Sequence, residues 1–299
     1  MTRGPERAAL QKRMAEGTEC GILSANNDEY LDLLKRCLTA WIYVESSHRP
    51  LRLGDIQGRT LKSFIKRLAV RTARQRGYQL SKLIPFDPEM RASGRDWPGF
   101  GYTMVGLRRL DNIQACVEDV LRNNVPGDLL EAGVWRGGAA IFMKAVLDRY
   151  GVVDRAVWLA DSFAGLPKPN QSKYPADTGY DLSDVGYLKV DLEEVKANFK
   201  RFGLLDANVK FLEGWFSETL PNAPIRRLAV LRLDADLYES TMDALAGLYH
   251  RVSAGGYVII DDYHPWPNCR RAVDEFRERN AIVAEIREID GLGVYWQVL

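Results

Sequence analysis

The chain has 299 residues, with 41 Lys and Arg against 40 Asp and Glu, so its net charge is close to zero. This balance gives no reason to expect a nucleic-acid partner, and we expect none. Four scattered cysteines without a CxxC pair or a histidine at ligand spacing exclude a disulfide framework and a zinc site, and they indicate a reduced, cytoplasmic protein.

The N-terminal region is predicted to be helical and partly ordered. Residues 1–27 read as a charged arm without the apolar core of ~7–15 residues that a signal peptide needs. Asp28 is a plausible N-cap for a helix that continues to residue 42, and residues 43–60 resemble a loop. Tyr43 and Glu45 are candidates for a lid that excludes water. Nowhere does the sequence reach the ~20 apolar residues of a membrane span, so we expect no integral membrane segment.

Residues 60–79 stand out in composition. They carry six basic side chains and no acidic one, while Leu61, Phe64, Ile65 and Leu68 recur at helical spacing. A basic amphipathic helix can bind a membrane surface or an anionic ligand. We favour the simpler interpretation, in which the apolar stripe docks onto the protein and the basic face is solvated.

A helix is predicted over residues 105–123, and regular alternation of strands and helices follows. This pattern predicts an α/β fold with a doubly wound, mostly parallel, seven-stranded sheet that ends in an antiparallel hairpin. We divide the chain into an N-terminal helical arm and lid region, 1–100, and a second domain, 101–299. The predicted strands are 128–134, 156–161, 209–213, 228–234, 257–261, 282–289 and 294–298. The predicted helices are 138–150, 192–202, 240–252 and 268–279.

Acidic side chains follow two of these strands. Asp234 and Asp236 come after the fourth strand, and Asp261 and Asp262 come after the fifth, beyond a helix whose end is marked by a Gly255-Gly256 pair. A parallel crossover brings both strand ends to the edge of the sheet where ligands bind. Helix capping would explain any one of these carboxylates, but it poorly explains all four. We therefore expect a functional site at this edge.

The first strand and the next helix are joined by a glycine-rich turn. Glu131, Gly133 and Gly137 belong to an ExGxxxGG pattern, which lets the backbone approach a ligand but lacks the GxGxxG spacing of pyrophosphate-binding turns. Asp161 ends the second strand, where an acidic residue commonly accepts hydrogen bonds from ribose hydroxyls. Trp215 follows the third strand and is a candidate to cover an adenine ring, or else a core aromatic residue.

Seven segments together resemble the macrocin O-methyltransferase family, and the resemblance runs from about residue 28 to the C-terminus. Its members are metal-dependent sugar O-methyltransferases of antibiotic biosynthesis that use S-adenosylmethionine. The resemblance implies a Rossmann-like class I methyltransferase fold, a glycosylated small-molecule acceptor and a homo-oligomer, a dimer or larger. The segments are GRDWP (94–98), TMVGLRRLDN (103–112), GDLLEAGVWRGGA (127–139), DSFAGLP (161–167), GWFSETLP (214–221), LRLDADLYEST (231–241) and GGYVIIDDY (255–263).

The resemblance also implies a role for each matching residue. It assigns Mg²⁺ to Asp234, Asp261 and Asp262, and the general base to Asp236. Mg²⁺ suits such a site because hard cations prefer carboxylate oxygens, and a bound cation with a nearby base makes a sugar hydroxyl a better nucleophile. The residues implied to contact the cofactor are Thr103, Met104, Glu131, Gly133, Asp161, Ser162, Gly214 and Trp215, and Gly137 of the glycine turn is a ninth candidate.

Two further residues and three competing functions stay open. His264 follows the acidic pair and is a candidate to contact the acceptor or act as a second base, and Trp266 is a candidate for the acceptor pocket. A catechol-type phenolic O-methyltransferase would use the same metal chemistry. A non-catalytic methyltransferase-like partner protein would need a broken acidic cluster, and a nicotinamide-dependent dehydrogenase would need the missing GxGxxG.

Overall fold

The computed structural model of the chain describes residues 28–43, 48–51, 53, 56, 58, 60–83 and 85–299. The predicted arm over residues 1–27 and the lid candidate Glu45 lie outside the described residues. Within the described part, no helix is both long and apolar enough to cross a membrane.

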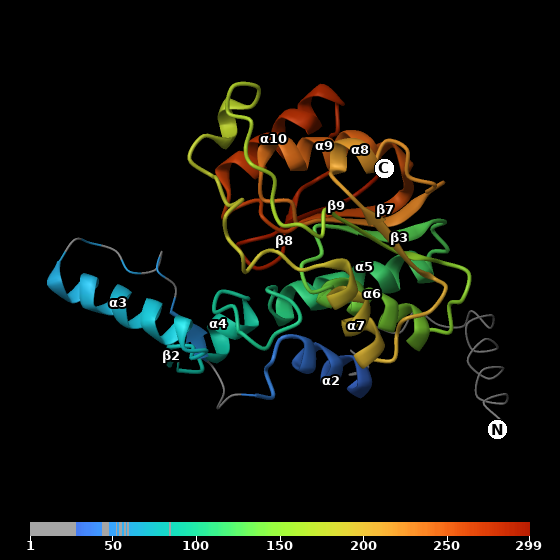
Figure 1. Ribbon diagram of the computed structural model, residues 1–299. Coiled ribbons are helices and arrows are strands. Elements are labelled where there is room, and N and C mark those ends of the chain that lie inside the picture. The colour runs from blue at the N-terminus through green and yellow to red at the C-terminus, as the bar shows by residue number, and fades with distance from the viewer. Residues whose placement is uncertain are drawn as a thin grey trace.

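A sheet lies at the centre of the molecule, between layers of helices (Figure 1). It has seven strands in the order β5-β4-β3-β6-β7-β9-β8. From β5 to β7 neighbouring strands are parallel, whereas β9 is antiparallel to both β7 and β8. The predicted doubly wound sheet with an antiparallel C-terminal hairpin is confirmed. The strands are β3 (Asp128–Ala132), β4 (Val157–Asp161), β5 (Val209–Glu213), β6 (Leu228–Leu233), β7 (Val252–Ile260), β8 (Arg287–Glu288) and β9 (Val294–Gln297).

Helices cover both faces of this sheet, and each face has its own apolar core (Figure 1). In α5, for example, Leu110, Ile113 and Val117 are fully buried because they recur on one side of the helix. One face is covered by α2 (Glu29–Leu38), α5 (Leu107–Arg122), α6 (Gly138–Arg149) and α7 (Leu192–Arg201). The other is covered by α8 (Phe216–Thr219), α9 (Tyr238–Leu248) and α10 (Pro267–Arg279).

The strand order places a switch point between β3 and β6. From β3 the chain proceeds outward to β4 and β5, and it then returns to β6 on the other side of β3 before continuing to β7. Connections that leave neighbouring strands in opposite directions open a crevice beyond their carboxyl ends. Asp234, which follows β6, and the glycine turn, which follows β3, therefore lie at the same crevice.

The helix after β6 ends earlier than predicted. α9 stops at Leu248, the 3-10 turn η3 (Tyr249–Arg251) follows, and β7 begins at Val252 rather than residue 257. Gly255 lies inside β7 with a φ of +82°, next to a shift in the register between β6 and β7. The prediction that the glycine pair marks the helix end is wrong, because glycine serves a strand irregularity as readily as a helix end.

The predicted strand 282–289 is also much shorter in the structure. Only Arg287 and Glu288 form β8, whereas Ile282 and Ile286 pack against the core from irregular backbone. Alternating apolar residues here reflect burial of one side of the segment and not a hydrogen-bonded ladder.

Helix α3 (Leu61–Gln75) lies within the predicted basic segment and projects from the body of the molecule (Figure 1). Its apolar stripe is not docked as expected, since Leu61 is 74% exposed and Phe64 is 62% exposed. The predicted loop 43–60 contains β1 (His48–Pro50), which pairs with β2 (Ser81–Leu83), and α4 (Pro88–Ala92) follows.

Candidate active site

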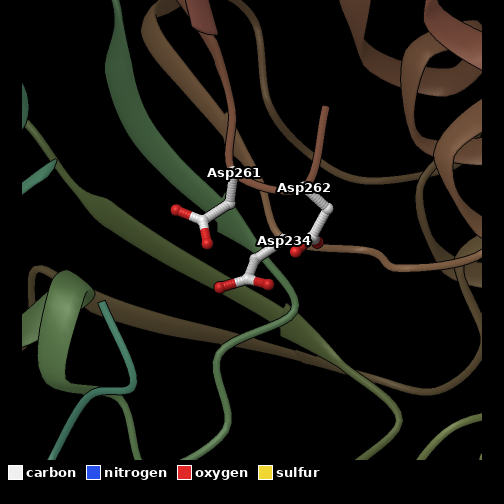
Figure 2. A group of neighbouring side chains, drawn as sticks. All are labelled: Asp234, Asp261 and Asp262. Carbon is white, nitrogen blue, oxygen red and sulfur yellow. The ribbon is translucent and has the colours of Figure 1, made fainter. Parts of the chain in front are cut away.

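Three aspartates meet at the carboxyl ends of β6 and β7. One carboxylate oxygen from each of Asp234, Asp261 and Asp262 lies within 4.8 Å of the other two (Figure 2). The two strands are adjacent and parallel, so their ends coincide at this edge. Asp261 and Asp262 are buried, whereas 28% of the Asp234 side chain is exposed. This is a donor set of a kind that holds a divalent cation with oxygen ligands.

A buried arginine within β6 donates hydrogen bonds to this cluster. Arg232 donates from Nη2 to Asp261 at 2.5 Å and to Asp234 at 3.1 Å, and from Nη1 to Glu131 on the neighbouring strand β3. Only 1% of Arg232 is exposed, so its charge needs these carboxylates. The apolar strand LAVLRL contains this one basic residue, and that signal in the sequence was missed.

A second arginine, Arg109, forms an ion pair with Asp261. Arg109 of α5 donates from Nη1 to Asp261 Oδ2, while its Nε lies 3.1 Å from Asp290 Oδ2. The two arginines together fix both oxygens of Asp261. No pattern in the sequence links Arg109 to a residue so far along the chain. Four acidic residues pair with the two arginines: Glu131, Asp234, Asp261 and Asp290. Asp236 and Asp262 contact each other next to them, so six carboxyl groups gather around two guanidinium groups, which favours a cation.

Asp236 faces the cluster because the chain turns sharply after β6. The strand ends at Leu233, and Asp236 adopts a φ of +55°, a left-handed conformation that Asp tolerates better than most residues. Its backbone N–H donates to Asp262 Oδ2 at 3.2 Å. Burial, together with the charges of Asp234 and Asp261, raises the pKa of Asp236 to about 8. A raised pKa makes the carboxylate a stronger base once its proton has been lost.

Two cavities meet at these aspartates. The first, about 290 Å³, contains the glycine turn and Asp161. The second, about 490 Å³, lies over the carboxylate cluster and has Trp97, Tyr187 and Trp266 in its wall. Four residues line both cavities: Met104, Leu188, Asp234 and Asp236. A group bound in one cavity can therefore meet a group bound in the other.

Comparison with known proteins decides the family. The sequence model of the family described as macrocin O-methyltransferase (TylF) matches residues 27–298. The chain belongs to the macrocin O-methyltransferase family. The methyltransferase is 46% identical over 275 residues to demethyldecarbamoylnovobiocin O-methyltransferase of Streptomyces niveus, covering 92% of this chain and 95% of the relative.

A second relative and a solved structure agree. The 8-demethyl-8-(2,3-dimethoxy-alpha-L-rhamnosyl)-tetracenomycin-C 4'-O-methyltransferase of Streptomyces olivaceus is 48% identical over 271 residues, covering 90% of this chain and 92% of that protein. The structure of the O-methyltransferase NovP superposes with a TM-score of 0.77 at 45% identity, covering 90% of this chain and 98% of that one. The predicted family, fold and enzyme class of this methyltransferase are confirmed.

Six of the nine residues predicted to bind the methyltransferase's cofactor line the first cavity: Met104, Gly133, Asp161, Ser162, Gly214 and Trp215. The other three do not. Thr103 is buried and accepts a hydrogen bond from the N–H of Val105. Glu131 is paired with Arg232. Gly137 begins α6, where a Cβ would lie 3.0 Å from Val195.

Asp161 holds the walls of the first cavity together. Its Oδ2 accepts from the N–H of Val134 and its Oδ1 accepts from the N–H of Phe163, both at 2.8 Å. Burial raises its pKa. Ser162 Oγ also lies 3.5 Å from Oδ1, whereas Oδ2 has a second lone pair with which Asp161 can accept from a bound hydroxyl.

The structure does not bring His264 into either cavity wall of the methyltransferase. Its Nε2 lies 2.9 Å from both carboxylate oxygens of Glu288 in β8. Trp266, two residues further along, does line the second cavity, where it packs edge-on against Tyr180.

Proposed function

We propose that this cytoplasmic enzyme transfers the methyl group of S-adenosylmethionine to a sugar hydroxyl of a glycosylated natural product, with Mg²⁺ held by Asp234, Asp261 and Asp262. One observation carries the proposal: Asp234 and Asp236 belong to the walls of both cavities, while Asp261 and Asp262 line only the second. A methyl donor in the first cavity and an acceptor in the second would meet beside a cation and a base.

The first cavity suits S-adenosylmethionine. Asp161 would accept from the ribose, the backbone at Gly133 would approach the methionine part, and Trp215, which is 38% exposed, would cover the adenine ring. The cofactor supplies a methyl group already activated on a sulfonium, so the protein needs only to orient it and expose a nucleophile.

The second cavity suits an acceptor with neighbouring hydroxyls. Mg²⁺ bound to the three aspartates would favour loss of a hydroxyl proton. Asp236 would accept that proton, since its backbone is fixed beside Asp262 and its pKa is already raised. Arg109 and Arg232 would keep Asp261 in a single orientation, so that the ligand set is preorganised.

The relatives support a glycosylated acceptor, because one is named for a decarbamoylnovobiocin and another for a rhamnosyl-tetracenomycin. The wall formed by Trp97, Tyr187 and Trp266 would contact an apolar aglycone next to the sugar. The same aromatic wall also favours a second candidate, a phenolic diol of the catechol class. A diol on an aromatic ring would use the same metal and base.

Product analysis separates these candidates. The enzyme would be incubated with Mg²⁺, methyl-labelled S-adenosylmethionine and a panel of glycosylated natural products, with catechol included. We expect mass spectrometry to find label on a sugar. Label on catechol alone would favour the phenolic candidate, and the absence of any labelled product from both groups would count against the proposal.

We also propose a homo-oligomer in which a second copy covers the apolar stripe of α3. Four large apolar side chains on one side of this helix are more than half exposed, and such a surface is costly to leave in water. They are Leu61, Phe64, Ile65 and Leu68. We also propose that the chain divides near residue 100. The part before this boundary would be the arm and lid region, and the part after it the methyltransferase domain.

A further inference from the structure

The glycine turn after β3 carries two large side chains, Trp135 and Arg136. Trp135 lines the first cavity, and its Nε1 donates to the backbone carbonyl of Tyr187 at 2.9 Å. Tyr187 lines the second cavity, and its ring centroid lies 5.2 Å from that of Trp135. One indole therefore joins the wall of the cofactor cavity to the wall of the acceptor cavity.

Arg136 makes a matching connection to a different segment. Its Nη1 donates to the backbone carbonyls of Gly99 at 2.9 Å and Gly101 at 2.8 Å. The guanidinium also lies 4.4 Å from the Trp135 ring centroid, at cation–π distance. The turn itself is anchored from α7, where Asn198 donates to the Arg136 carbonyl at 3.0 Å.

Neither connected segment has regular structure of its own. Residues 94–104 and 182–188 contain turns and bends without a helix or strand, yet both contribute to the wall of the second cavity. Irregular segments with few local hydrogen bonds open more easily than packed helices and strands. The contacts that reach them from the glycine turn therefore help to fix their positions, alongside others such as the Arg91–Asp96 ion pair in the first segment.

We propose that Trp135 and Arg136 are positioning residues that couple the two cavities, so that a cofactor packed against the glycine turn orders the walls that receive the acceptor. The inference rests on the proposed cofactor site. A ligand that restrains Trp135 restrains the Tyr187 carbonyl through the indole N–H, and it restrains Gly99 and Gly101 through the stacked guanidinium. Couplings between binding sites are typically about 5–150-fold, and we expect one near the lower end of that range.

Hydrogen exchange with S-adenosylhomocysteine as the probe tests this coupling without an acceptor or a metal. In the unaltered enzyme, saturating probe should slow amide exchange in residues 94–104 and 182–188 by about fivefold or more. Trp135→Phe keeps an aromatic ring but loses the donor, so it should remove the effect in 182–188. Arg136→Met keeps the aliphatic stem but loses both donors, so it should remove the effect in 94–104.

Trp158→Phe is the matched control. Trp158 is also half-buried, and its Nε1 donates to Asp128 Oδ2 at 2.8 Å, outside both cavity walls. It should keep the full effect in both segments. Calorimetry should measure the probe affinity of each variant, so that exchange is compared at concentrations that saturate every one of them.

Three results would overturn the coupling. The first is protection from exchange that survives in 182–188 after Trp135→Phe. The second is an equal loss of protection in both segments in all variants. The third is a loss of protection in the Trp158→Phe control. If the probe binds and one of these is seen, the coupling fails while the proposed function stands. If the probe does not bind the unaltered enzyme at all, both fail.

Discussion

The Asn268 side chain donates to Asp177 Oδ1 at 2.8 Å and to the backbone carbonyl of Asp236 at 3.2 Å. Asp177 belongs to the 3-10 turn η2 (Pro175–Asp177), is fully buried, and also accepts from the N–H groups of Tyr238 and Glu239 in the first turn of α9. The residue at the N-cap position, Leu237, has no side-chain oxygen to do this. Asp177 therefore caps α9 from a distant segment, and through Asn268 it holds the turn that carries the proposed base.

Asp177→Ala should cost both stability and turnover. It leaves two N–H groups and the Asn268 amide without their acceptor, which should lower the free energy of unfolding by about 1–3 kcal/mol. Turnover should fall at least about tenfold, since a small displacement of a reacting group is costly. Asp191→Ala is the control, because Asp191 caps α7 locally by accepting from Glu194 at 2.8 Å. That variant should lose stability alone, and an equal loss of turnover in both would contradict the positioning role.

Asp236→Asn should retain the turn and lose the chemistry. Asn tolerates the left-handed backbone at φ +55° as well as Asp does, but it cannot accept the hydroxyl proton. We expect turnover to drop at least ~10²-fold, the usual scale for general acid–base catalysis. Calorimetry with S-adenosylhomocysteine should find cofactor binding intact. Near-normal turnover would remove Asp236 from the mechanism.

Removal of divalent metal should abolish methyl transfer. Asp234, Asp261 and Asp262 lie close enough to share one ion, and the acceptor hydroxyl is a poor nucleophile without it. We expect a chelator to stop turnover and added Mg²⁺ to restore it. Asp262→Asn should weaken the response to Mg²⁺ while Asp181→Asn, an exposed acidic residue outside both cavity walls, leaves it unchanged. Full activity in chelator would reject the metal-dependent mechanism.

Stability should depend on pH in a direction that Mg²⁺ opposes. Burial raises the pKa of Asp236 to about 8, from a usual value of 3.8. Between those values the folded, metal-free protein keeps a proton that the unfolded chain has released, so the free energy of unfolding falls as pH rises. Mg²⁺ competes with such protons and should raise Tm more at pH 8 than at pH 6. Thermal melts at both pH values test this, and a larger Mg²⁺ effect at pH 6 would contradict it.

A charge on the α3 stripe should change the oligomeric state. Phe64→Glu places a carboxylate in the middle of the exposed apolar surface, where a second copy would have to bury it. Light scattering should then give a smaller particle than the unaltered protein. Lys62→Glu adds a carboxylate to the same helix outside the stripe and should leave the mass unchanged. An unchanged mass in Phe64→Glu would place the contact between copies elsewhere.

The sequence was most informative where local pattern and sheet topology agree. The convergence of Asp234, Asp261 and Asp262 followed from two parallel strands that end on acidic residues, and the structure brings their oxygens together. Pairings between distant segments were beyond this reasoning. Arg109 and Asp261 are 152 positions apart, and Asp177 and Asn268 are 91 apart, so no local period connects them.

Glu131 illustrates a different difficulty. Its place before the glycine turn is typical of a cofactor contact, and its Oε1 pairs with Arg232 within the sheet, while its buried Oε2 has no hydrogen-bond partner among the described residues. A pattern of residues identifies the turn without telling which side chains point into the cavity. For the same reason Gly137 belongs to the motif yet serves helix packing.

The shared wall of Met104, Leu188, Asp234 and Asp236 has a practical consequence for inhibition. A single molecule that joins an adenosine to a sugar through a short linker would pass these four side chains and fill both compartments at once. Such a compound would bind more tightly than either of its halves, because the two halves are linked. Altering any of the four shared residues would weaken the binding of both halves.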